Sequence, residues 1–252
     1  MTCSVRAQSE GVAVLQYGSS DQQTVEFLIP PNTGRPRGTA VLIHGGYWRA
    51  RFDATLMHPL AKDLTARGWA VANIEYRRVG NGGGWPATLD DVQAALQAVR
   101  SATPRDRAGL PVVGIGHSVG GQLALLAAED LDAVVALAPV TDVARADREG
   151  LGEGAARQFM GSASTDAARA FARASPIRRV PVGCPLLVVH GDIDDRVPVE
   201  HSQDFTAAAK AAGDNVEFRV VPGLGHLEAI DPKAAHWAGV AEWMDGLMPL
   251  AG

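Results

Sequence analysis

The hydrophobic pattern of the chain changes after about its first thirty residues. Apolar and polar positions alternate in residues 12–17 and again in residues 24–29, and a polar turn at 18–21 separates the two stretches. A period of two residues is typical of half-buried strands. The two stretches therefore predict an antiparallel hairpin, which Pro30 and Pro31 end.

Short apolar runs follow the hairpin, and stretches with helical periodicity separate them. Runs that are apolar at nearly every position predict strands buried on both faces, as in parallel sheets with helical crossovers. We therefore expect an α/β fold, a single domain over residues 1–252 with about eight strands in a mostly parallel sheet and helices on both faces. The strands that we predict after the hairpin cover residues 39–43, 69–75, 111–115, 133–138, 185–189 and 216–221, and the helices cover 56–67, 86–100, 119–129, 199–212 and 236–247.

One segment interrupts this alternation. Residues 141–180 are rich in Ala, Arg, Gly and Asp and contain no strand-like run. Ligands bind beyond the carboxyl ends of parallel strands, where lids are commonly placed. We predict that the segment is a short helical lid insertion at that edge, and the alternative is a surface excursion that does not contact the substrate.

The composition narrows the classes of function. The net charge is −5 and the basic residues are scattered, so we expect no nucleic-acid partner. No run approaches the roughly 18 apolar residues of a membrane span, and the first residues lack an apolar secretion signal, which favours a cytoplasmic protein without membrane association. Cys3 and Cys184 do not have the spacing of a metal or redox site.

A G-x-S-x-G sequence stands where the predicted strand 111–115 meets a helix. The sharp turn that joins a strand to a helix in this way projects a serine hydroxyl above the sheet, and it needs small residues two before and two after the serine. Gly116 and Gly120 stand at those positions around Ser118. We predict that Ser118 is a catalytic nucleophile, and the alternative is a glycine-rich turn that contains serine by chance.

A second glycine-rich loop, His44-Gly45-Gly46-Tyr47-Trp48, follows the predicted strand 39–43. Glycines at such a loop let backbone N–H groups approach the oxyanion of a tetrahedral intermediate. The N–H group that follows the nucleophile supplies another donor. We therefore predict an oxyanion hole made by Gly45, Gly46 and Val119, and we expect His44 to anchor the loop through hydrogen bonds.

The loops after the last two predicted strands carry a candidate acid and a candidate base. A nucleophilic serine needs a histidine to take its proton and a carboxylate to orient that histidine. In sheets of this type the three follow the order serine, acid, histidine. His226, in the glycine-rich loop after residues 216–221, is the predicted base, while Asp192, Asp194 and Asp195 all follow residues 185–189 and spacing alone does not separate them.

The chain resembles the esterase–lipase branch of the α/β-hydrolases, which includes carboxylesterases and feruloyl or acetyl-xylan esterase-like proteins. The segment HGDIDDRVP also resembles the HGxxDxxVP motif of dienelactone-hydrolase-like and prolyl-oligopeptidase-like enzymes, whose triad acid is the middle aspartate, and this implies Asp194. The motifs that carry the resemblance are HGGYW at 44–48, EYRR at 75–78, WPATLDDVQAAL at 85–96, GHSVGG at 116–121, HGDIDDRVP at 190–198 and GH at 225–226.

The resemblance implies a serine hydrolase that cleaves small carboxylic esters through an acyl-enzyme intermediate, with Ser118, Asp194 and His226 as its triad and without a cofactor or metal. The HGGYW motif is also similar to kynurenine formamidases, so an arylformamidase that acts on an N-formyl aryl amide is the main alternative. A serine peptidase and a non-catalytic binding domain are further alternatives.

Three aromatic residues lie next to the predicted site loops. Tyr47, Trp48 and Trp85 are predicted to line the substrate pocket, since aromatic walls suit aryl or short acyl groups, and the alternative is that they pack the loops against the core. The expected partner is a small-molecule ester or amide substrate. A second copy of the chain, in a homodimer, is a further candidate partner, since the sequence does not fix the oligomeric state.

Overall fold

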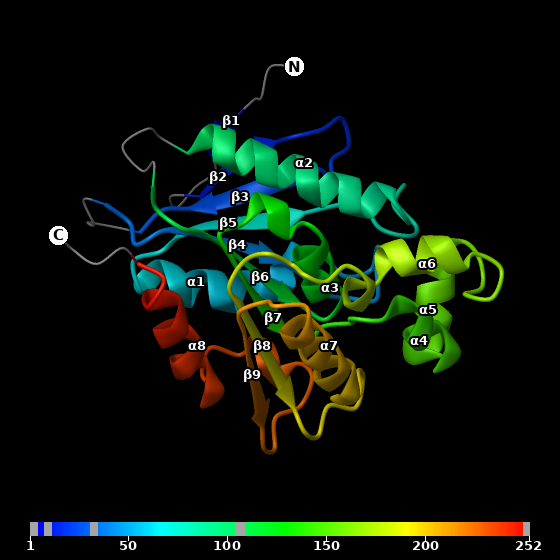
Figure 1. Cartoon of the computed structure of the whole chain (residues 1–252). Coiled ribbons are helices and arrows are strands. Elements are labelled where there is room, and N and C mark those ends of the chain that lie inside the picture. Colours follow the sequence, from blue (N-terminus) through cyan, green and yellow to red (C-terminus); the bar gives the residue numbers. More distant parts are fainter. Residues whose placement is uncertain (1–4, 8–11, 31–34, 104–108, 249–252) are drawn as a thin grey trace.

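The computed structural model describes residues 5–7, 12–30, 35–103 and 109–248. Within them one nine-stranded sheet runs through the molecule in the order β1-β2-β3-β5-β4-β6-β7-β8-β9 (Figure 1). The first three strands are antiparallel to their neighbours, and all later pairs are parallel. The strands are β1 (Val5–Ala7), β2 (Val12–Gln16), β3 (Thr24–Leu28), β4 (Thr39–Ile43), β5 (Ala70–Glu75), β6 (Val112–His117), β7 (Ala133–Leu137), β8 (Leu186–Gly191) and β9 (Val216–Val221).

Helices cover both faces of the sheet. Residues of α2, α3 and α7 form a core with one face, and residues of α1 and α8 form a core with the other. No helix in the described part of the chain is both long and apolar enough to cross a membrane. The α-helices are α1 (His58–Ala66), α2 (Ala87–Ala102), α3 (Val119–Leu126), α4 (Val143–Arg148), α5 (Leu151–Met160), α6 (Ala168–Ala174), α7 (Glu200–Ala211) and α8 (His236–Asp245), and the 3-10 turns are η1 (Ala54–Met57), η3 (Ala128–Asp130), η4 (Pro176–Arg178) and η5 (Glu228–Ile230).

The predicted α/β fold is confirmed, because the central strands are buried as their apolar runs require. Every residue of β4, β6, β7 and β8 is buried, whereas β2 and β3 are only partly buried. The sheet has one strand more than predicted. β1 pairs with β2 over only three residues, which is too short for a period of two to be recognised in the sequence.

The segment that interrupts the alternation contains helices and no strand. Residues 141–180 include α4, α5, α6 and η4. Figure 1 shows these helices grouped at one end of the sheet, beyond α3. Their side chains form a separate apolar cluster with residues of the loop after β4, so the segment packs over that loop.

The parallel register brings four loops to one edge of the sheet. Ile43 at the end of β4 lies opposite Gly116 of β6, and Gly191 at the end of β8 lies opposite Val221 of β9. The strands therefore end at the same level. The loops that follow β4, β6, β8 and β9 contain the residues for which the sequence predicts chemistry.

Candidate active site

Ser118 occupies a strained turn between β6 and α3. Its φ of 56° and ψ of −119° lie in a region that residues other than glycine rarely adopt, at a cost of about 1–3 kcal/mol. The surrounding backbone holds this conformation, since the Ser118 N–H donates to the Leu137 carbonyl at 2.8 Å. A Cβ atom on Gly116 would collide with the Gly120 carbonyl, and one on Gly120 would collide with the Ile43 carbonyl. Both glycines are therefore required by the packing of the turn.

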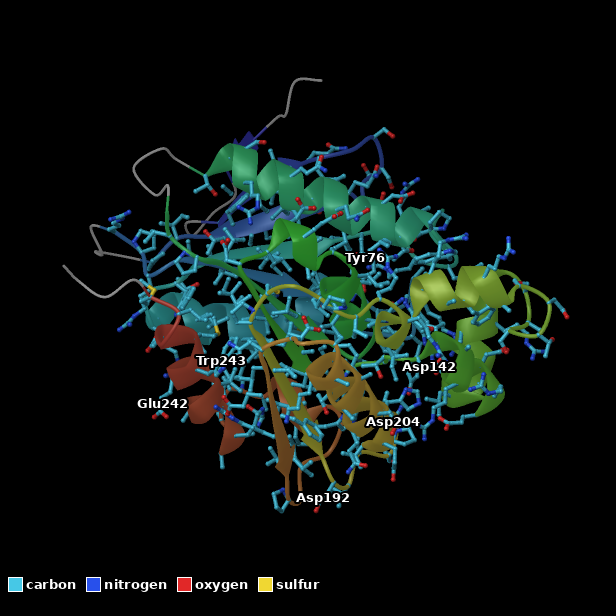
Figure 2. The ribbon with its side chains drawn as sticks, viewed as in Figure 1. Tyr76, Asp142, Asp192, Asp204, Glu242 and Trp243 are labelled. Atoms are coloured by element: carbon cyan, nitrogen blue, oxygen red, sulfur yellow. The ribbon has the colours of Figure 1, made fainter. Side chains whose placement is uncertain are left out.

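His226 and Asp194 are in contact. The loop after β9 brings His226 Nδ1 to 2.7 Å from Asp194 Oδ2, and the two side chains are only 7% and 1% exposed. The other two aspartates of the loop after β8 face solvent. Asp195 pairs with Arg196, and Asp192 lies at the exposed tip of the loop, where it accepts the Gly223 N–H (Figure 2). Of the three aspartates that spacing left open, the structure brings Asp194 to the histidine.

Four N–H groups surround the Asp194 carboxylate. Its Oδ1 accepts the backbone N–H groups of Arg196 and Val197 at 2.8 and 2.9 Å, and its Oδ2 contacts the rings of His226 and His190, the latter at 3.2 Å. Burial alone would raise the pKa of Asp194, but the hydrogen bonds from His190, His226 and the Val197 N–H outweigh it and hold the pKa far below its ordinary value of 3.8. The buried carboxylate is therefore ionised.

His190 is the second histidine that contacts the Asp194 carboxylate. Its ring is fully buried, with Nε2 at 2.9 Å from the Val197 carbonyl and Nδ1 at 2.7 Å from Ser202 Oγ. Because a carbonyl can only accept, Nε2 carries the proton and the Ser202 hydroxyl donates to Nδ1. The sequence did not predict this contact of His190 with Asp194. The one available signal was its place at the end of a fully apolar strand, where a solvated histidine has no room.

His117 connects the serine turn to the histidine loop. Its Nε2–H donates to the His226 carbonyl at 3.0 Å, and the two ring centroids lie 4.6 Å apart. Burial, followed by the effect of the neighbouring His226, lowers the pKa of His117 to about 3. The ring is therefore neutral at pH 7, and its hydrogen bond keeps the base loop next to the residue that precedes Ser118.

The glycine loop after β4 lies against the serine turn. A Cβ atom on Gly45 would stand 3.1 Å from Ser118 Cβ and 2.9 Å from His117 Nδ1, so the loop backbone approaches the serine closely. Gly46 has a φ of 116°, which favours glycine. Val119 is the first residue of α3, so its N–H has no partner within the helix. The structure thus places Gly45 and Val119 next to Ser118, and Gly46 follows Gly45 in the same loop.

A network of mostly buried side chains around His44 holds the glycine loop in place. His44 is fully buried, lies 3.3 Å from Glu75 and 3.0 Å from Arg78, and stacks on Tyr76 with ring centroids 4.3 Å apart. The Tyr76 hydroxyl donates to the His44 carbonyl at 2.6 Å, and Arg78 forms an ion pair with Glu75. His44 therefore anchors the loop as expected. The EYRR segment at 75–78 supplies its partners, which the sequence reasoning did not identify.

The three aromatic residues have different surroundings. Trp48 is 2% exposed, stacks on Phe159 at 4.5 Å and donates its indole N–H to Gln122. Trp85 is half-buried and meets the edge of the same phenylalanine at 6.2 Å. Trp48 and Trp85 therefore have the contacts expected of residues that pack the loops against the core, which was the alternative to lining the substrate pocket. Tyr47 instead lines a cavity of about 340 Å³, together with Arg49, Arg51, Arg196, Asp195 and residues 149–153.

The order of the strands, the strained serine turn after β6 and the acid and histidine loops after β8 and β9 define an α/β-hydrolase. Within this superfamily, the family model described as BD-FAE matches residues 25–209, and the chain belongs to that family. The resemblance to the esterase–lipase branch is thereby confirmed.

Known proteins with related sequences and folds carry esterase names. The chain is 31% identical over 215 residues to Esterase LipQ and 28% identical over 217 residues to Esterase LipC, both from Mycobacterium tuberculosis. These matches cover 77% and 76% of the chain, but it spans only about half of each relative, 51% and 53%. Among solved structures, a truncated carbohydrate esterase from gut microbiota matches with a TM-score of 0.79 and 20% identity, over 98% of this chain and 96% of that one.

The ionised Asp194 predicts a characteristic pH dependence of stability. A carboxyl group whose pKa is lowered by folding stabilises the protein above its unfolded-state pKa, and this stabilisation is lost as the pH falls through the folded-state value. We expect Asp194→Asn to lower the free energy of unfolding at about pH 7, and the difference from wild type to shrink below about pH 4. Urea denaturation at a series of pH values measures this difference. A difference that stays constant down to about pH 3 would contradict the ionised buried carboxylate, and Asp195→Asn serves as the exposed control.

Proposed function

We propose that the protein is a serine hydrolase that cleaves small carboxylic esters, with Ser118 as nucleophile, His226 as general base and Asp194 as the acid that orients it. The observation that carries this proposal is the buried Asp194–His226 hydrogen bond of 2.7 Å, held against the serine turn by His117. Because His226 Nδ1 bonds Asp194, its Nε2 is the nitrogen available to a serine hydroxyl.

The reaction has two halves. In the first, His226 Nε2 takes the proton of the Ser118 hydroxyl as Oγ attacks the carbonyl carbon, and the negative charge on the carbonyl oxygen is stabilised by the N–H groups of Gly45, Gly46 and Val119. His226 then protonates the departing alkoxide, which leaves an acyl group on Ser118. In the second, His226 takes a proton from water as the water oxygen attacks the acyl carbon. The bond between the acyl carbon and Ser118 Oγ then breaks while His226 returns the proton to Oγ, and the carboxylic acid leaves. Asp194 stays ionised throughout and stabilises the transient imidazolium.

Ester substrates are supported by the relatives, two of which are named esterases. The arylformamidase alternative rested on the HGGYW motif alone, and the relatives do not favour it. In the present structure Trp48 of that motif is a packing residue that stacks on Phe159, so the motif has a structural role that needs no aryl amide.

A small acyl group is supported by the packing around the serine turn. Val119 belongs to an apolar cluster with Trp48 and with Val143, Phe159 and Phe171 from the 141–180 segment, and all five side chains are at most 2% exposed. This closely packed cluster leaves little space for a long alkyl chain beside Ser118.

We propose that the 141–180 segment is a lid. Arg49 joins it to the glycine loop through a 2.8 Å hydrogen bond to the carbonyl oxygen of a helix α5 residue, Gly152.

The first prediction concerns the nucleophile. Wild-type protein is expected to hydrolyse p-nitrophenyl acetate, and Ser118→Ala is expected to lower kcat by a factor of about 10³ or more, because no other group in the site replaces the attacking oxygen. Release of p-nitrophenolate measures the rate, and circular dichroism checks that the variant is folded. Turnover within a factor of about ten of wild type by the folded variant would contradict the mechanism.

The second prediction separates the neighbouring aspartates. Asp194→Asn removes the acceptor of the His226 proton and is expected to lower kcat by up to about 10⁴. Asp195 is exposed and bonds only Arg196 among the described residues, so Asp195→Asn is expected to leave kcat within a factor of about two. Steady-state kinetics of both variants at one pH measures the contrast. Equal losses would refute the assignment of Asp194.

The third prediction concerns acyl length. Across a series of p-nitrophenyl esters, kcat/KM is expected to be highest at acetate or butyrate and to fall toward longer chains, because the apolar cluster beside Ser118 is closely packed. Phe159→Ala opens this cluster and is expected to move the optimum toward longer chains. A wild-type optimum at octanoate or beyond would overturn the small-acyl proposal.

A further inference from the structure

Among the described residues the sheet ends at β9, and on the outer side of this strand none of them pairs with its backbone groups. The Leu186 N–H donates to the Asn215 carbonyl, and the Asp192 N–H donates to the Val221 carbonyl, at the two ends of the β8–β9 ladder. In a parallel ladder every second residue directs both its N–H and its C=O toward the neighbouring strand. With the observed register, Glu217, Arg219 and Val221 face β8. The N–H and C=O groups of Val216, Phe218 and Val220 therefore point outward from the sheet.

The side chains of β9 divide by face. Val216, Phe218 and Val220 share one face, where the first two pack against the core under α7 and Val220 is 42% exposed. Glu217 and Arg219 share the other face and form an ion pair at 2.7 Å, with side chains 48% and 32% exposed. An edge with free hydrogen-bonding groups and an exposed valine is a template for pairing with another strand.

The sequence of β9 is complementary to itself when a second copy runs antiparallel to it. With a two-fold axis at Phe218, the outward backbone groups form three hydrogen-bonded pairs: Val216 with Val220 of the partner subunit, Phe218 with Phe218 of the partner subunit, and Val220 with Val216 of the partner subunit. Between them, Glu217 lies directly opposite Arg219 of the partner subunit, in the closely spaced type of antiparallel pair.

The charges select this register. If the two-fold axis moves to Glu217, two glutamates lie opposite each other, and if it moves to Arg219, two arginines do. Like charges in directly opposed pairs are unfavourable. If the register shifts by a single residue, each outward-facing residue of one β9 lies opposite a residue of the other β9 whose N–H and C=O already bond β8. The free backbone groups of the two strands then cannot form hydrogen bonds with each other. Among the registers that pair most of the strand, the one centred on Phe218 joins opposite charges.

We propose that the protein forms a homodimer in which β9 pairs antiparallel with β9 of a second copy, so that the two sheets become one continuous sheet. The carboxyl ends of the two β9 strands then point in opposite directions, and each leads to its own His226. Each candidate active site is complete within one copy, so dimer formation and hydrolysis are separable properties.

Charge variants test the interface. Sedimentation velocity of wild-type protein at tens of micromolar is expected to give a species of twice the 26.4 kDa chain mass. Arg219→Glu places a carboxylate opposite Glu217 and is expected to weaken dimerisation at least tenfold, and adding Glu217→Arg to this variant is expected to restore it. Lys62→Glu, an exposed charge reversal on α1, is the matched control and is expected to leave the dimer unchanged. Hydrolysis by the monomeric variant is expected to stay within twofold of wild type.

Disulfide trapping tests the position of the axis. The Cα atoms of a hydrogen-bonded antiparallel pair lie about 5.5 Å apart, within disulfide range, so Phe218→Cys is expected to cross-link to itself on oxidation. Val216→Cys is the control, since its two copies lie on opposite sides of the axis, and wild type measures the background from its own cysteines. A monomeric wild type overturns the proposal, and so does a dimer that is unaffected by Arg219→Glu or that cross-links equally through residue 216.

Discussion

The burial of an ionised carboxylate at the end of β8 is the constraint on which the site depends. Removing a carboxylate from water is costly unless hydrogen-bond donors replace the water, and four N–H groups do so around Asp194. Two come from the turn that the loop forms with Arg196 and Val197, and two come from histidine rings. One of these rings, His226, reaches Asp194 because β9 ends beside β8, so the sheet register brings the histidine of the β9 loop to the carboxylate.

The same edge of the sheet imposes a second constraint, which is the close approach of two loops around Ser118. The glycine loop after β4 contacts the serine turn after β6 at distances that a side chain at Gly45 would prevent. The loop keeps this position because the buried His44 contacts the partly buried Glu75 and the buried Arg78. Backbone strain at the serine is thus stabilised by packing from β4, β5 and β7 rather than by local sequence preference.

Much of the fold was predictable because the apolar runs of parallel strands and the periodicity of their crossover helices are strong local signals. The serine turn and the glycine loop were predictable for a similar reason, since only small residues fit there. Local signals did not separate Asp194 from Asp192 and Asp195, because the choice depends on which side chain the loop turns inward. The contacts of His190 and His117 were missed because their partners come from distant parts of the chain. β1 was too short to show a period.

The central claim is that an acyl group is carried by Ser118 and by no other residue. A p-nitrophenyl alkylphosphonate reacts with an activated serine to give a stable adduct, which tests this claim without turnover. Intact-mass spectrometry followed by peptide mapping is expected to show one adduct per chain, located on Ser118, with stoichiometric release of p-nitrophenolate. The absence of an adduct, or an adduct on a different residue while hydrolytic activity is lost, would contradict the account.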